Sequence, residues 1–264
     1  MTGMTARRPA RSGHRTTRTA LASAALVTLA VVATGCELTG KVTESEQTYT
    51  VDGRTAKLDV STPGGDIKVV ADDTADGRVK VTERLEYGKQ KPVTRHSLKD
   101  GALNLTAEDC GRSNGTCNVS YEVRVPPSVA VTLSTDGGNI GVTGIMGTVG
   151  TRTSGGNIDV RQTAGPLTAE TSGGDINISD ARGKQTTAST DGGMIDARFT
   201  AVPDRVDAHS GGGNVSVRLP QGRYAIDATT DGGNRNVTGS VDSASPHKIK
   251  AHSDGGDVGV TVGR

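Results

Sequence analysis

Three cysteines carry the most distinctive chemistry in this 264-residue chain. Cys110 and Cys117 lie seven positions apart in a polar segment that contains two glycines. Two cysteines this close, in a chain whose N-terminus indicates export, predict a disulfide. On the chain-entropy model, closing so short a loop stabilises the fold by about 2–3 kcal/mol. A metal-binding pair is the alternative, but no histidine or further cysteine stands at ligand spacing beside them.

The third cysteine, Cys36, follows a segment with the parts of an export signal. Five arginines within residues 7–18 precede an uncharged, largely apolar stretch over residues 20–33. That stretch is too short for a membrane-spanning helix, which needs about 20 residues, but it suits a secretory signal peptide. The sequence Ala33-Thr34-Gly35-Cys36 resembles the lipobox of bacterial lipoproteins. The resemblance implies cleavage before Cys36 and acylation of its thiol; the alternative is an ordinary signal peptide followed by an unrelated cysteine.

Carboxylates recur beside pairs of glycines, which suggests calcium sites as one interpretation. Aspartate precedes a Gly-Gly pair at four places: Asp136, Asp191, Asp231 and Asp254. Calcium-binding β-rolls use a nine-residue repeat that brings carboxylates from adjacent turns onto one ion. Here the period is about twice as long and the third glycine is missing. The pattern therefore favours turn chemistry, in which Asn and Asp side chains bond to nearby backbone groups.

Two histidines, His209 and His252, each stand three residues before a Gly-Gly pair. Their position in the repeat predicts outward side chains two coils apart, and hence solvated histidines and no metal site. Catalytic carboxylates of polysaccharide-active β-helices must converge in a groove, whereas the acidic residues here are dispersed. The motifs of nucleophile elbows, zinc proteases and phosphate-binding loops are missing from the sequence. We therefore expect no catalytic site and no cofactor.

The composition limits which elements could position these residues. The chain has 37 glycines and 2 % aromatic residues, and its hydrophobic fraction is 33 %, below the ~45–50 % usual for soluble domains. These values argue against an ordinary α/β enzyme and a helix bundle, and favour a narrow interior of Val, Ile, Ala and Thr. Without residues 1–35 the chain carries 25 basic and 29 acidic residues. Mild acidity and few aromatic side chains argue against nucleic-acid binding.

A repeat of Gly-Gly pairs organises most of the chain. The pairs begin at residues 64, 137, 155, 173, 192, 212, 232 and 255. Each has Ser or Thr two positions before it and mostly Ile or Val three and five positions after it. Spacing by two is the period of a half-buried strand. Each unit is therefore expected to be strand, tight turn, strand, in which the glycines and the following Asn or Asp tolerate positive φ.

Two all-β architectures satisfy this pattern. In a β-solenoid, equivalent positions of 18–20-residue repeats stack in register; in an antiparallel meander or prism, each Gly-Gly pair is a hairpin turn. Near-constant steps and a hydroxyl column kept through eight units favour the solenoid, whose stability comes from nearest-neighbour stacking. Met194 interrupts the Asn/Asp column and Arg235 interrupts the apolar column, so we expect local irregularity at both.

The run from Tyr121 to Pro127, YEVRVPP, leads into the segment LSTDGGNI that ends at Ile140. With the repeats that follow, it resembles the bacterial "putative adhesin" β-strand-repeat family of unknown function, over residues 45–264. The resemblance implies an exported, all-β, solenoid-like surface protein. It brings no established activity and no catalytic residues.

These observations predict four regions: a lipoprotein signal peptide at 1–35, a lipid anchor and polar tether at 36–47, an N-terminal β region with a disulfide loop at 48–127, and a Gly-Gly array at 128–264. The predicted protein is anchored by lipid on the extracytoplasmic face of the cell membrane and acts as a non-catalytic, adhesin-like binding module. Its expected partners are membrane lipid, through acylated Cys36, and a cell-wall glycan or an envelope protein. An accessory or sensor role in an envelope signalling complex is the alternative, and a polysaccharide-active β-helix enzyme is a third, less favoured one.

Overall fold

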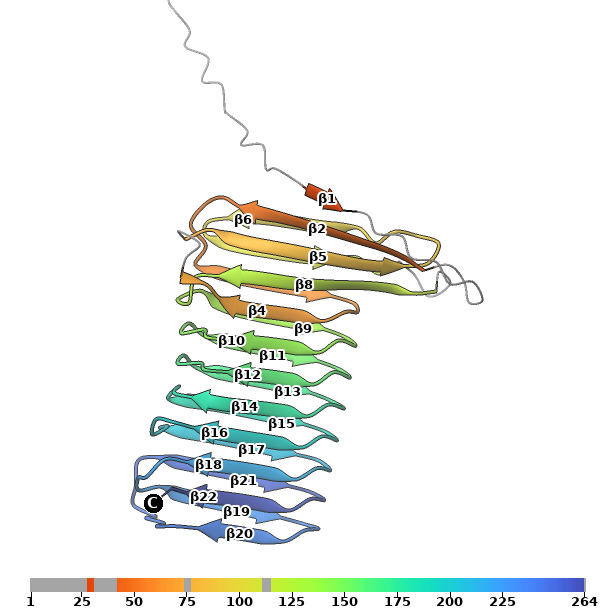
Figure 1. Ribbon diagram of the computed structural model, residues 1–264. Coiled ribbons are helices and arrows are strands. Elements are labelled where there is room, and N and C mark those ends of the chain that lie inside the picture. The colour runs from red at the N-terminus through yellow and green to blue at the C-terminus, as the bar shows by residue number, and fades with distance from the viewer. Residues whose placement is uncertain (1–27, 31–41, 74–76, 111–114, 264) are drawn as a thin grey trace, which may run out of the picture.

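The computed structural model describes residues 28–30, 42–73, 77–110 and 115–263. Within those ranges every named element is a β-strand, and none of the described residues forms a helix long and apolar enough to cross a membrane. The strands make two sheets, of 12 and 10 strands, on either side of a single core. Figure 1 shows the result as a stack of flat coils.

Each coil contributes one strand to either sheet, with its Gly-Gly pair in the turn between them. The strands before the pairs are β3 (Lys57–Thr62), β9 (Ala130–Thr135), β11 (Val149–Thr153), β13 (Leu167–Thr171), β15 (Gln185–Thr190), β17 (Arg205–Ser210), β19 (Ala225–Thr230) and β21 (Lys248–Ser253). The strands after them are β4 (Ile67–Ala71), β10 (Ile140–Thr143), β12 (Ile158–Arg161), β14 (Ile176–Ala181), β16 (Ile195–Phe199), β18 (Val215–Leu219), β20 (Arg235–Thr238) and β22 (Val258–Val262).

Neighbouring coils pair in parallel and in the register of the repeat. Ile158 of β12, for example, lies between Ile140 and Ile176, and Thr153 of β11 lies between Thr135 and Thr171. This pairing confirms the all-β solenoid of strand-turn-strand repeats, because hairpin turns would have given antiparallel pairs.

The coils do not follow one another in space as they do in the chain. The β3–β4 coil stacks directly on the β9–β10 coil, although residues 72–129 separate the two in sequence. At the other end, the β21–β22 coil lies between the β17–β18 and β19–β20 coils. Figure 1 shows β22 between β18 and β20, so the last coil of the chain is not the last coil of the stack.

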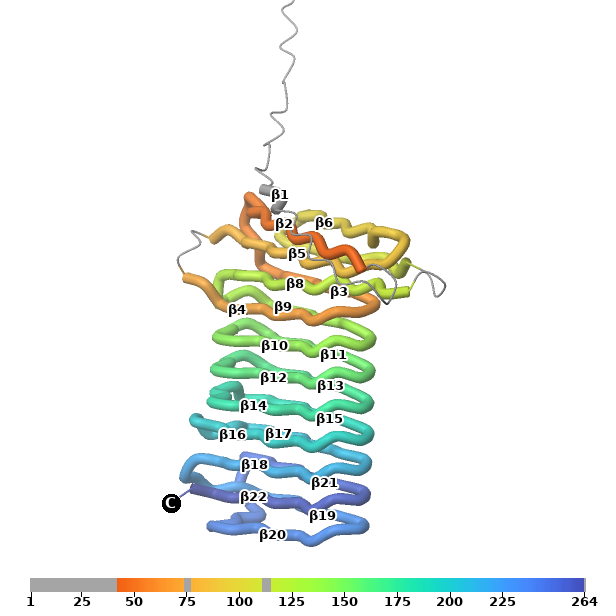
Figure 2. Tube along the Cα trace, turned by 45° about the vertical axis from the view of Figure 1, so that its right-hand side comes forward, coloured from red at the N-terminus to blue at the C-terminus, as the bar shows by residue number. Residues whose placement is uncertain are grey.

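An N-terminal cap covers the β3–β4 end of the stack (Figure 2). It consists of β1 (Thr28–Ala30), β2 (Thr43–Val51), β5 (Val79–Tyr87), β6 (Thr94–Lys99), β7 (Ala102–Ala107) and β8 (Cys117–Val125). Strands β1, β2, β5 and β8 pair antiparallel, and β8 joins them to β4. Strand β2 begins at Thr43, so residues 43–47 of the segment expected to be a polar tether are strand.

The interior of the coils is lined by aliphatic columns. Ile140, Ile158 and Ile176 are at most 1 % exposed, and the facing strands contribute small residues such as Ala169 and Ala188. Close approach of the two sheets over such small side chains gives the narrow Val, Ile, Ala and Thr interior that the composition predicts. The fold therefore buries a continuous core without large rings in most coils.

The Ser/Thr column is buried and binds backbone, not other hydroxyls. The Thr153 hydroxyl donates to the carbonyl of Gly138 in the preceding coil at 2.9 Å, and it accepts from the N–H of Gly156 in its own turn at 3.2 Å. Thr171 makes the same pair of bonds one coil further on. Each hydroxyl thus links two coils and closes its own turn.

The second glycine of each pair is required by stacking, and the expected positive φ is wrong for this column. Gly65, with φ of +108°, is its only member in that region. A Cβ at Gly156 would overlap the carbonyl oxygen of Gly138 in the coil before. The first glycine has more room, since the nearest atom to a Cβ at Gly155 is a carbonyl oxygen 4.0 Å away.

The Asn/Asp residues after the glycines form a third column of bonds between coils. The Asn157 N–H donates to Asn139 Oδ1 at 2.9 Å, and the Met194 N–H donates to Asp175 Oδ1 at 2.8 Å. Met194 has no side-chain acceptor to continue this column. Ile195 beside it pairs in register with Ile176 and Val215. The irregularity in this coil lies further along, where the register between β14 and β16 shifts between Ile178 and Ala181.

Arg235 sits in regular backbone, paired with Val258 of β22, so the local irregularity expected there is wrong. The β19–β20 coil is the open end of the stack, and Arg235 is exposed. Its Nε donates to the carbonyl of Ala228 at 2.7 Å. An arginine is tolerated in the apolar column because no further coil covers it.

Candidate functional site

The two cysteines expected to form a disulfide lie at the cap end of the molecule. Cys110 and Cys117 form a disulfide with Cα atoms 5.9 Å apart, and Cys117 begins β8. Cys36, the expected lipidation site, lies outside the described residues.

Among the described residues, the aspartates considered for calcium form no group of three acidic ligands. Asp136, Asp191, Asp231 and Asp254 are all exposed. The Asn and Asp side chains after the glycines instead accept backbone N–H groups of neighbouring coils, as Asp66 does from Asn139 at 2.8 Å. Of the described His, Cys, Asp and Glu side chains, one group comes close enough together to hold an ion: His209, His252 and Asp254.

The two histidines are adjacent, which corrects the expectation that they lie two coils apart. His209 of β17 is the register partner of His252 of β21, because the β21–β22 coil is placed directly against the β17–β18 coil. Their rings stack with centroids 5.3 Å apart and planes within 5°. The hydroxyl and glycine columns, which all coils share, do not distinguish this coil order from the sequential one. The one signal for it is Arg235, which interrupts the apolar column in the coil that ends the stack.

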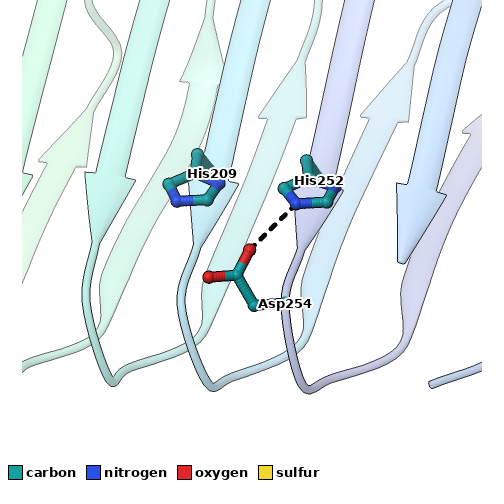
Figure 3. A group of neighbouring side chains, drawn as sticks. All are labelled: His209, His252 and Asp254. Carbon is teal, nitrogen blue, oxygen red and sulfur yellow. Dashed lines mark hydrogen bonds and ion pairs between the residues drawn. The ribbon is translucent and has the colours of Figure 1, made fainter. Parts of the chain in front are cut away.

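Asp254 and Thr229 complete this histidine cluster. The Asp254 carboxylate lies at the edge of the two rings, as Figure 3 shows, with Oδ1 2.9 Å from His252 Nε2. On the other side of the ring, His252 Nδ1 is 2.8 Å from the hydroxyl of Thr229 on β19. Both histidines are partly buried and Asp254 is exposed, so the cluster opens to solvent on the outer face of the 10-stranded sheet.

A second polar cluster is enclosed in the cap. Glu83 of β5 is 1 % exposed and accepts three hydrogen bonds: from the Tyr49 hydroxyl at 2.5 Å, from Gln47 Nε2 at 2.5 Å and from the Thr94 hydroxyl at 2.9 Å. Three donors satisfy a buried carboxylate and hold β2 and β5 in register. Sequence analysis missed this cluster, although the alternation along β5 places Glu83 on the same face as Val81 and Leu85.

Glu83 affects the pKa of two cap tyrosines, Tyr49 and Tyr121, to different extents. Burial raises the pKa of the Tyr49 hydroxyl, and its hydrogen bond to Glu83 raises that pKa further. Burial also raises the pKa of Tyr121, with a smaller contribution from the charge of Glu83. The Tyr121 hydroxyl is buried without a hydrogen-bond partner. Both tyrosine hydroxyls are therefore buried and protonated, which suits a structural role for this cluster.

Two hollows lie beside the C-terminal coils, whose order in space differs from their order in the chain. One, of about 310 Å³, has apolar walls from Val206, Ile226 and Ile249 and charges from Arg205, Asp227 and Lys248. The other, of about 390 Å³, is lined in part by Arg223, Asp242 and His247. Neither includes the histidine cluster or Glu83.

Comparison with known proteins adds a family and a fold. The family model Toastrack DUF4097 matches residues 32–261. A solved structure from Bacteroides fragilis NCTC 9343, named "putative adhesin", has a TM-score of 0.52 and 17 % identity over 84 % of this chain and 97 % of its own. At that identity the likeness shows the fold alone.

Two further solved structures are less similar. A "putative lipid binding protein" from Parabacteroides distasonis ATCC 8503 has a TM-score of 0.44 and 11 % identity, over 83 % of this chain and 97 % of its own. A "putative adhesin" from Parabacteroides merdae ATCC 43184 has a TM-score of 0.41 and 11 % identity, over 86 % and 98 %. Among curated proteins, none matches the chain.

Proposed function

This chain belongs to the Toastrack DUF4097 family, and we propose that it is a non-catalytic surface-binding module, held on the outer face of the cell membrane by acylated Cys36. The name "putative adhesin" carried by the Bacteroides fragilis structure of the same fold supports a binding role. Attachment through two or more acyl chains is stable, whereas a single chain holds a protein only marginally.

The observation that carries this proposal is the contrast between uniform inner columns and varied outer positions. Inside, the coils from β9–β10 to the end of the stack repeat the same hydroxyl and glycine contacts. Outside, the position before each hydroxyl varies along the stack: Ser61, Ser134, Arg152, Glu170, Ser189, His209, His252 and Thr229 in spatial order. A rigid frame with a variable outer face suits recognition through many weak contacts.

The short distance along the chain between Cys36 and β2 supports an anchor at the cap end. Five residues separate Cys36 from Val42, a reach of at most about 20 Å. They lead into β2, which lies on the outer side of the cap. Strands are about 4.8 Å apart, so the coils would extend roughly 35 Å from the cap and present the C-terminal coils farthest from the membrane. Cleavage before Cys36 would remove β1 and leave the outer edge of β2 unpaired.

Binding is tested by retention of purified residues 37–264 on fractions of the organism's own envelope, separated into cell wall, glycan and membrane protein, with and without calcium. We expect saturable retention on wall or glycan, independent of calcium and displaced by excess soluble fraction. Capture of a single membrane protein would instead support an accessory role in a signalling complex. Failure to bind any fraction would contradict a binding function.

Anchoring is tested separately in the full chain. Cys36→Ala should move the protein from the membrane fraction to the soluble or secreted fraction. The control is the double variant Cys110→Ala with Cys117→Ala, which removes the disulfide and should leave the protein on the membrane. A Cys36→Ala protein that stays membrane-bound would contradict lipid anchoring.

A further inference from the structure

The histidine cluster sits where the order of the coils departs from the order of the chain. His209 belongs to β17, whereas His252 and Asp254 belong to β21 and the turn after it. These residues are 43 and 45 positions apart, and they meet only because the final coil is placed between two earlier ones. Anything that binds all three side chains would hold this final coil in the stack.

We propose that His209, His252 and Asp254 form a binding site for a zinc-class divalent transition-metal ion. One imidazole nitrogen from each histidine and one carboxylate oxygen all lie within 4.8 Å of one another. Ligand atoms around a tetrahedral zinc ion, at 2.0–2.2 Å from the metal, are roughly 3.3 Å apart. The closing movement is therefore at most about 1.5 Å, and rotation of the two stacked imidazole rings together with the exposed Asp254 side chain supplies it.

Thr229 prepares His252 for this role. In proteins, the imidazole nitrogen that faces away from a metal ion is usually hydrogen-bonded, which fixes the orientation and tautomer of the ring. The Thr229 hydroxyl lies 2.8 Å from His252 Nδ1 and so leaves Nε2 toward Asp254 and His209. When the ion binds at Nε2, the single ring proton moves from Nε2 to Nδ1 by tautomer exchange, and Nδ1–H then donates a hydrogen bond to the oxygen of the Thr229 hydroxyl.

The ligand set selects the class of metal. Two imidazoles and one carboxylate suit zinc and its neighbours in the transition series. Calcium needs six to eight oxygen ligands, which this cluster does not offer. Three protein ligands leave a fourth tetrahedral position for water or an external ligand. His247 provides a natural contrast: its Nδ1 is 3.3 Å from Asp204 Oδ1, but this pair is not part of any group of three ligands among the described residues.

The test is calorimetric titration of the purified protein, free of any polyhistidine tag, with zinc chloride in a non-coordinating buffer. We expect one ion per chain with micromolar or tighter affinity, and no saturable binding of calcium. His209→Asn and His252→Asn should each weaken zinc binding at least tenfold, and Asp254→Asn should weaken it by less. His247→Asn is the matched control and should bind zinc as the parent protein does.

A second measurement separates the site from a folding defect. Saturating zinc should raise the melting temperature of the parent protein and of His247→Asn, because the ion binds the folded state, but not that of His209→Asn or His252→Asn. Circular dichroism of the metal-free variants checks that each has the parent fold. An absence of saturable zinc binding, or binding that persists unchanged in both His209→Asn and His252→Asn, would overturn the proposal. The proposal does not depend on which envelope partner the protein binds.

Discussion

The N-terminal cap and the coil array share the same two sheets but are specified in different ways. In the cap, antiparallel strands are joined by contacts that occur once, such as the Tyr49–Glu83 hydrogen bond and the Cys110–Cys117 disulfide. In the array, parallel coils are joined by contacts that recur at every step, such as those of Thr153 and Thr171.

This difference explains how the last coils can be permuted. Unique contacts define both register and neighbour, so each cap strand has one place. Repeated contacts define register only, because the coils offer the same hydroxyl and glycine positions to one another and, except at Met194, the same Asn/Asp position. The Ser253 hydroxyl bonds to the carbonyl of Gly213, and the Thr230 hydroxyl to that of Gly256, so the recurring bonds pass through the inserted coil unchanged.

The largest loss of stability is expected from a substitution in the second-glycine column, where the coil before leaves no space for a Cβ atom. Gly156→Ala places a methyl group against the carbonyl of Gly138, and we expect it to destabilise the array by about 3–5 kcal/mol or prevent folding. Gly155→Ala is the control, with a nearest contact of 4.0 Å, and should cost less than about 1 kcal/mol. Urea unfolding followed by circular dichroism measures both. Equal losses would contradict the steric account of the glycine column.

Loss of the Tyr49–Glu83 hydrogen bond, which occurs once in the fold, should destabilise the cap. Tyr49→Phe removes a donor to the buried Glu83, and we expect a loss of about 1.5–3 kcal/mol, typical of a hydrogen bond to a charged group. Tyr121→Phe, its matched control, removes a buried hydroxyl that has no partner and should be neutral or stabilising. The free energy of unfolding distinguishes the two. A larger loss for Tyr121→Phe would show that Glu83 does not organise the cap.

One array coil contains both a bonded and an unbonded threonine. Thr190 donates to Gly174 and accepts from Gly193, so Thr190→Val should cost about 1–3 kcal/mol. Thr186 is buried without a partner, so Thr186→Val should stabilise by roughly 1 kcal/mol. Thermal unfolding of the two variants should shift in opposite directions. Shifts of the same sign would contradict the role assigned to the hydroxyl column.

The smallest predicted effect comes from a substitution that completes the Asn/Asp column at Met194. Met194 supplies no oxygen to the N–H of the following coil, so Met194→Asn should complete the Asn/Asp column and stabilise by about 0.5–1 kcal/mol. Met146→Asn is the control, since Met146 is similarly exposed, at 56 % against 51 %, and lies outside that column. The difference in melting temperature between the two variants is the readout. Equal melting temperatures would show that the column adds no stability.

Much of the array could be predicted from the sequence, because the repeat spacing shows which positions of the coils are equivalent and therefore pair. The buried Ile140 and Thr153 columns, and the turn at each Gly-Gly pair, follow from spacing alone. The reason for the second glycine could not be predicted, since the overlap at Gly156 involves a carbonyl of another coil. The proximity of His209 and His252 was not predicted either, because the shared hydroxyl and glycine columns do not say which coils are neighbours. Arg235 in the apolar column was the one indication that the β19–β20 coil ends the stack.

The cap was less predictable for the opposite reason. Alternation along β5 puts Glu83 on the inner face, but its partners Gln47, Tyr49 and Thr94 come from two other strands. Period-two patterns say which face a residue takes and not which strand it meets. Contacts that occur once in a fold leave no repeated signal to detect.

The order of the C-terminal coils is the central claim, and disulfide trapping tests it directly. In the structure Lys250 of β21 pairs with Asp207 on one side and Asp227 on the other. Strands one step apart are within disulfide range, whereas strands two steps apart, about 9.6 Å, are not. In residues 37–264, oxidised Asp207→Cys with Lys250→Cys should form a cross-link, and Asp207→Cys with Asp227→Cys should not. Cross-linking of the second pair and not the first would show that the coils stack in chain order, and would contradict this account.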